Sequence, residues 1–109
     1  MTSSPLTPLS LHILLSLVDA PLHGYGILKV IEGRTDGEET PSTGALYLAL
    51  QRLEREGHIQ PGDAPESETD ARRRYWALTP DGRDAARAEV ERLAALVGHP
   101  SARLLRAEG

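Results

Sequence analysis

The segment 40–57 constrains the fold of this chain more than any other part of the sequence. Its leucines recur at spacings of four and three residues, the period of an amphipathic helix, as Leu46, Leu50 and Leu53. Thr40 or Ser42 can supply the N-cap, because a hydroxyl oxygen accepts a hydrogen bond from an unpaired amide of the first turn. Gly57 suits the end of the helix, since glycine adopts the left-handed conformation without steric cost. We therefore predict a helix here with a buried leucine stripe.

Two runs of strand composition follow this helix. Residues 58–60 and 74–78 carry the β-branched and aromatic side chains that favour strands. The intervening residues 61–71 are rich in Pro, Gly, Asp, Glu and Ser, which is typical of a mobile loop tip. Together the two runs predict a β-hairpin with a long tip.

Two shorter helices are expected before this segment. Residues 9–18 have apolar side chains at helical spacing, and the same period restarts over residues 25–33. The residues 22–26 between them contain two glycines and are expected to form a tight connector.

A fourth helix is expected after the hairpin. Thr79 can cap it, and the Gly-His-Pro sequence at 98–100 must break or kink it before a short final piece at 101–106. The order of elements predicts a mainly α fold with a small β-hairpin, a winged helix-turn-helix (α-α-α-β-β-α) followed by a C-terminal helix. The expected parts are a loose arm at 1–8, the winged helix-turn-helix at 9–79, and the C-terminal helix and tail at 80–109.

Composition excludes several function classes. The chain has no cysteine, so disulfides and thiolate metal sites are impossible. Its four histidines lack metal-ligand spacing and no glycine-rich phosphate loop is present, so we expect no enzyme activity, cofactor or metal. No apolar run approaches the roughly 20 residues of a membrane span, and we expect a cytoplasmic protein without a membrane partner. With no phenylalanine the core must be mainly aliphatic, and so light a core favours burial against a partner chain.

Polar residues on the third helix are candidates for contact with duplex DNA. A winged helix-turn-helix places this helix in the major groove, where side chains near its start reach base edges and phosphates. The candidates are Ser42, Thr43, Tyr47 and Gln51. Ser42 and Thr43 have the alternative role of capping the helix, and the two roles are compatible. Tyr47 lies beside the leucine stripe rather than on it, so its hydroxyl is expected to face DNA.

A run of arginines at the base of the hairpin supplies the other candidate contacts. Arg72, Arg73 and Arg74 lie where a wing meets phosphates or the minor groove. The net charge of −4 argues against indiscriminate coating of nucleic acid but not against specific binding, which local charge decides. The acidic tip from Asp63 to Asp70 would be repelled by phosphate and is not expected to contact DNA.

Three strings in this order resemble the PadR family of transcriptional regulators. They are LHGYGI at 22–27, STGALYLALQRLEREGHI at 42–59 and RRYWALTPDG at 73–82. The resemblance covers about residues 9–83. It implies a winged-helix homodimer that represses transcription by occupying a palindromic operator.

The same resemblance implies that the last helix forms the dimer interface. One apolar stripe fits this role: Ala86, Val90, Leu93, Leu96 and Val97. The helix at 9–18 is expected to contribute to it. The short C-terminal region is similar to that of the smaller PadR subfamily.

The sequence departs from the family pattern at three positions. Ala45 stands where threonine is usual and Leu48 where proline is common, so one phosphate contact of the family is expected to be missing. Trp76 replaces the more usual second tyrosine of the third string.

The sequence is compatible with two other hypotheses. Overall acidity and the alanine at position 45 favour a winged helix that binds another protein and has no DNA target, whereas the three arginines and the string at 42–47 oppose it. A small-molecule effector is a further hypothesis, suggested by the family alone. Because no aromatic residue follows Trp76, Tyr25 and Trp76 are the candidates for an effector pocket, with core packing as their alternative role.

Overall fold

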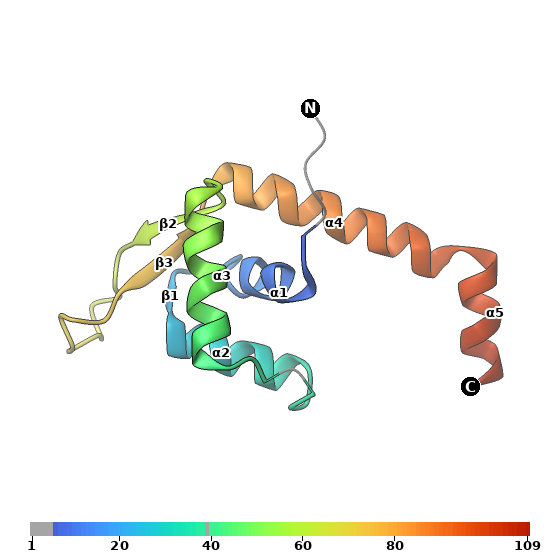
Figure 1. The fold of residues 1–109 in the computed structure, drawn as a ribbon, viewed down its shortest axis with the longest axis horizontal. Coiled ribbons are helices and arrows are strands. Elements are labelled where there is room, and N and C mark those ends of the chain that lie inside the picture. Colours follow the sequence, from blue (N-terminus) through green and yellow to red (C-terminus); the bar gives the residue numbers. More distant parts are fainter. Residues whose placement is uncertain (1–5, 39) are drawn as a thin grey trace.

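The computed structural model describes residues 6–38 and 40–109, which form five helices and three strands (Figure 1). In chain order these are α1 (Pro8–Ser16), β1 (Leu22–His23), α2 (Gly24–Arg34), α3 (Thr43–Arg55), β2 (Ile59–Gly62), β3 (Tyr75–Leu78), α4 (Pro80–Gly98) and α5 (Pro100–Glu108). The mainly α winged-helix prediction is confirmed. The first five residues of the expected N-terminal arm lie outside the described residues, and Thr7 and Pro8 belong to the start of α1.

Side-chain caps fix where four of the helices begin. In each case the side chain of the cap residue accepts a hydrogen bond from a backbone amide three residues later, which pairs an otherwise free donor. The cap residues are Thr7, His23, Ser42 and Thr79, with nitrogen–acceptor distances of 2.9–3.1 Å. At the other end of α3, Gly57 has a φ of +81°, as the sequence predicts.

Some boundaries differ from the predictions. α1 ends at Ser16 rather than at residue 18, and α2 includes the Gly24–Gly26 segment and continues through Gly33. The turn expected at residues 61–62 is part of β2, because Pro61 and Gly62 pair with β3. The Pro-Gly pair suggested a turn, but proline is also compatible with an edge strand, because there its missing N–H removes no hydrogen bond of the sheet.

The sheet has a third strand that the hairpin prediction missed. Its strand order is β1-β3-β2 and both pairings are antiparallel. In β1, Leu22 lies opposite Trp76 and His23 opposite Tyr75. Two residues are too few to show the alternation by which a strand is recognised. Residues 22–26 were therefore predicted as a connector and β1 was not predicted. The wing consists of β2, β3 and the loop between them. The pairing of β1 with β3 fixes the start of α2 against this wing.

The core lies where α1, α2 and α3 meet the sheet. It is mainly aliphatic, as composition requires, and its largest fully buried side chains are Ile13, Leu14, Ile27, Ile31, Leu46, Leu50, Leu53 and Ile59. Trp76 from β3 and Ala86 from α4 complete the same cluster. Burial of the leucine stripe therefore turns the opposite face of α3 toward solvent.

α4 leaves this core and runs away from the wing, and α5 turns off its far end (Figure 1). The predicted break is confirmed: His99 has extended backbone between the two helices, and its Nδ1 accepts a hydrogen bond of 3.2 Å from the amide of Ser101. The molecule is consequently elongated, with extents of 51 × 35 × 24 Å.

Candidate DNA-binding surface

The exposed face of α3 carries the polar residues that the sequence selects. Ser42 and Thr43 are exposed at its N-terminal end, and Gln51 is exposed two turns further on. The capping role of Ser42 is present, because its Oγ accepts a hydrogen bond of 3.1 Å from the amide of Ala45. The remaining unpaired amides of this first turn form a local positive site suited to a phosphate oxygen.

The side chain of Tyr47 extends from α3 to the start of α2. Its side chain is 48% exposed, which fits its predicted position beside the leucine stripe. A methyl group at Gly24 would lie 2.7 Å from Tyr47 Oη, so only glycine lets the ring approach the α2 backbone this closely. The two helices are thus held with the hydroxyl of Tyr47 at their junction.

Each of the three wing arginines is paired with a carboxylate of the same chain. The nitrogen–oxygen distances are 3.3 Å for Arg72 to Asp70, 3.5 Å for Arg73 to Glu68 and 3.6 Å for Arg74 to Glu54. All three arginines are exposed, whereas the Glu68 side chain is only 10% exposed, so the pairs of Arg72 and Arg74 are the weaker and more exchangeable ones. The wing therefore presents cations whose partners a phosphate could replace.

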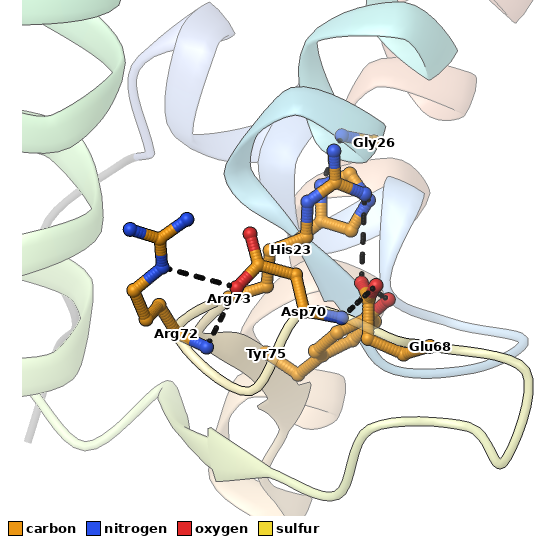
Figure 2. Close-up of polar contacts among 7 residues, drawn as sticks. All are labelled: His23, Gly26, Glu68, Asp70, Arg72, Arg73 and Tyr75. Carbon is orange, nitrogen blue, oxygen red and sulfur yellow. Dashed lines mark hydrogen bonds and ion pairs between the residues drawn. The ribbon is translucent and has the colours of Figure 1, made fainter.

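Glu68 organises the loop between β2 and β3 (Figure 2). Its carboxylate accepts hydrogen bonds from the Tyr75 hydroxyl at 2.6 Å and from the Asp70 amide at 3.1 Å. The Tyr75 hydrogen bond, followed by that from Asp70, holds the pKa of Glu68 below its ordinary value. The same bond and then burial raise the pKa of Tyr75. Two residues of the predicted acidic tip, Glu68 and Asp70, thus pair with the arginines Arg73 and Arg72.

His23 joins the wing to α2 (Figure 2). Its Nδ1 accepts a hydrogen bond of 3.0 Å from the amide of Gly26, so the neutral ring carries its proton on Nε2. Arg73 Nη1 lies 3.2 Å from that Nε2, and two N–H groups cannot hydrogen-bond to each other. The partner that orients Arg73 is therefore Glu68. The His23 ring packs edge-on against Tyr75, with 5.2 Å between the ring centroids.

An open cleft of about 340 Å³ lies between α3, the start of α2 and the wing. It brings together most of the predicted site residues: Tyr25, Tyr47, Gln51, Arg72, Arg73, Arg74 and Trp76. Ser42 and Thr43 are not among the residues that line it.

The two candidate effector residues differ in burial. Trp76 is 4% exposed and belongs to the core, and the Arg74 guanidinium lies 4.5 Å from its ring centroid. Tyr25 is 58% exposed, so its alternative role as a core residue is wrong. Its position at the start of α2, before the buried stripe of Ile27 and Ile31, places the ring outside the core.

Three polar residues of this surface were not selected from the sequence. His23 and Glu54 also line the cleft, and Glu68 holds the loop. His23 lies within the string at 22–27, which could have drawn attention to it. The pairing of Glu54 with Arg74 joins residues far apart in the chain and has no local signal.

The predicted dimer stripe on α4 is divided by the structure. Ala86 is 4% exposed and packs in the core of its own chain. Val90, Leu96 and Val97 are 41%, 59% and 50% exposed, and Leu93 is half-buried. Val90 also lines a shallow groove with Leu15 of α1 and with Val18, which follows that helix. The available apolar surface therefore begins at Val90 and continues toward α5.

Comparison with known proteins agrees with this geometry. The sequence profile described as "Transcriptional regulator PadR-like family" matches residues 13–88. The chain belongs to the PadR-like family of transcriptional regulators. A PadR family transcription regulator from Clostridium difficile is similar to this PadR-like chain, with 27% identity and a TM-score of 0.70 over 83% of this chain and 91% of that one.

Two other similarities are partial. Bacillus subtilis PadR, solved in complex with operator DNA, shares the fold with a TM-score of 0.65 and 21% identity, over 77% of this PadR-like chain and 48% of that one. An uncharacterized 37.1 kDa protein in transposon TN4556 of Streptomyces fradiae is 38% identical over 86 residues, which are 79% of this chain. The chain spans 23% of the length of that relative.

Within residues 6–38 and 40–109, no helix is long and apolar enough to cross a membrane. In the same ranges, no cluster of three or more His, Cys, Asp or Glu side chains has an arrangement that could hold a metal ion.

Proposed function

We propose that this chain is a sequence-specific DNA-binding regulator that acts as a homodimer on a palindromic operator and represses transcription. The observation that carries the proposal is the cleft that Tyr47 and Gln51 of α3 line together with the three wing arginines. The operator complex of Bacillus subtilis PadR, which has the same fold, supports it.

In the proposed complex α3 lies in the major groove. The groove is wide enough for one helix, so the side of α3 opposite its buried leucines meets the base edges. Ser42 and Thr43 bring the helix N-terminus to a phosphate, while Tyr47 and Gln51 supply donors and acceptors further along.

The wing arginines bind the neighbouring backbone by exchanging partners. Each guanidinium remains beside its carboxylate but donates its hydrogen bond to a phosphate oxygen instead, at the shorter distance of a charge-assisted bond. Glu68 keeps its bonds to Tyr75 and Asp70 during this exchange, so the loop retains its shape. The acidic tip does not contact DNA in this arrangement.

We further propose that residues 80–109 form the dimer and residues 9–79 bind DNA. Val90, Leu93, Leu96 and Val97 give α4 an apolar surface that a second copy would remove from water. Ala86 supports this surface from within its own core.

A small-molecule effector would compete with DNA if it bound at Tyr25 and Trp76. Both residues line the cleft proposed for the operator, and its volume of about 340 Å³ falls within the range of ligand pockets.

The decisive experiment is selection of bound sequences from a random duplex pool by the full chain. We expect a palindrome with half-sites roughly one DNA turn apart.

The affinity for DNA should fall as the salt concentration rises. Arg73→Ala should weaken binding to all sequences and flatten the salt dependence of log K by up to about one unit. Arg103→Ala, on exposed α5, is the matched control and should leave the slope unchanged. No enrichment of any sequence would refute the proposal and favour a protein-binding module.

A further inference from the structure

One exposed face of α3 has a leucine at its centre. Gly44, Leu48, Gln51 and Arg55 follow one another at spacings of four, three and four residues, so they share a face of the helix. All four are exposed, and Leu48 is 69% exposed. This face lies opposite the buried leucine stripe and adjoins the cleft through Gln51.

Folding does not account for an exposed leucine at this position. The packing of α3 is carried by Leu46, Ala49, Leu50 and Leu53, each at most 4% exposed. The other strongly exposed leucines, Leu96, Leu104 and Leu105, lie on α4 and α5, away from α3 (Figure 1). Leu48 is therefore a separate apolar feature on a helix face that is otherwise polar or lacks a side chain.

We propose that Leu48 contacts the C5-methyl group of a thymine in the major groove and so selects an A·T pair at one position of each half-site. The inference rests on the proposed function, because it requires α3 to lie in the groove. It names a specificity-determining residue rather than a further backbone contact.

The chemistry of the groove leads to thymine. A helix with its side chains is about as wide as the major groove, so the outer face of α3 is pressed against the base edges. The thymine C5-methyl is the one alkyl group that the four bases present there. A leucine has no donor or acceptor, so against any other base it would cover a polar edge and leave it unpaired. Attraction to the methyl and the cost of covering a polar edge both favour thymine.

The test removes the C5-methyl group of thymine from the bound duplex. Once a bound sequence has been selected with the full chain, each thymine is replaced in turn by uracil, which keeps the hydrogen-bonding edge of thymine. For the wild type we expect uracil at one position to weaken binding about fourfold per half-site, as burial of a single methyl group implies. Leu48→Ala should bind the thymine and uracil duplexes equally. Val30→Ala, which shortens a partly exposed apolar side chain on α2, outside the cleft and the proposed dimer segment, should retain the full uracil effect.

The outcomes separate this inference from the proposed function. Tight, sequence-specific binding that is insensitive to uracil at every position would overturn the role of Leu48 and leave DNA binding intact. A uracil effect of the same size in Leu48→Ala would also overturn it, because another residue would then contact the methyl. Failure to bind any duplex would overturn the proposed function and this inference together.

Discussion

Replacement of Glu54 by glutamine should tighten DNA binding, although it adds no positive charge. Glu54 Oε2 lies 3.6 Å from Arg74 Nη2. A phosphate oxygen that binds the same nitrogen at about 2.8 Å would therefore lie at most about 6.4 Å from the carboxylate oxygen. Two unit charges at that separation in water repel each other by about 0.6 kcal/mol, or about threefold in Kd. Removal of the carboxylate should abolish this repulsion at each half-site, so the Kd of a dimer for its operator should fall about ninefold.

Fluorescence anisotropy on a selected operator can measure this gain at several salt concentrations. Because the repulsion acts between exposed charges, the gain should be largest at low salt and should shrink as the Debye length falls. Glu108→Gln makes the same chemical change at the end of α5, far from α3 and the wing, and serves as the control (Figure 1).

The result that would refute the reasoning is equally definite. If Glu54→Gln binds no more tightly than the wild type at low salt, Arg74 does not hold a phosphate beside Glu54. A gain of the same size in Glu108→Gln would show that net charge, rather than the pairing of Glu54 with Arg74, sets the affinity.

Three other predictions concern stability and assembly. Gly82→Ala would drive a methyl group into the carbonyl of His58 and should lower the free energy of unfolding by about 1–3 kcal/mol; an unchanged denaturation midpoint would contradict this close packing. Since the hydrogen bond from Tyr75 lowers the pKa of Glu68, the ionised carboxylate stabilises the fold above the ordinary glutamate pKa, and this contribution is lost as the pH falls through the lower value of the folded state. The difference in unfolding free energy between wild type and Glu68→Gln should thus be constant from about pH 5 to 8 and shrink below about pH 4; a difference that persists in acid would argue against the carboxylate as its source. Leu93→Asp should yield monomers in light scattering, because it places a charge in the proposed apolar interface, and a persistent dimer would relocate that interface.

The parts of the fold that the sequence predicts are those that short-range interactions determine. The leucine spacing, the cap at Ser42 and the positive φ at Gly57 all act within α3 and specify it without reference to the rest of the chain. β1 is different, because two residues carry no period and become a strand only by pairing with β3. Its position follows from tertiary packing, which a local pattern does not record.

The same distinction separates the predicted and unpredicted parts of the surface. Tyr47 and the arginines could be selected because residue type and place in the winged-helix order suffice. The pairing of those arginines could not, because it depends on how the loop carrying Glu68 folds back and on the approach of Glu54 from α3.

This pairing changes what the three arginines imply about affinity. An arginine that is free in solution releases condensed counterions from DNA and adds its full share to the salt slope. An arginine that must first leave a carboxylate exchanges one anion for another, and the displaced carboxylate remains near the phosphate. The wing of this acidic chain should therefore contribute less to non-specific attraction than three arginines suggest, so that discrimination between sequences depends more on the outer face of α3.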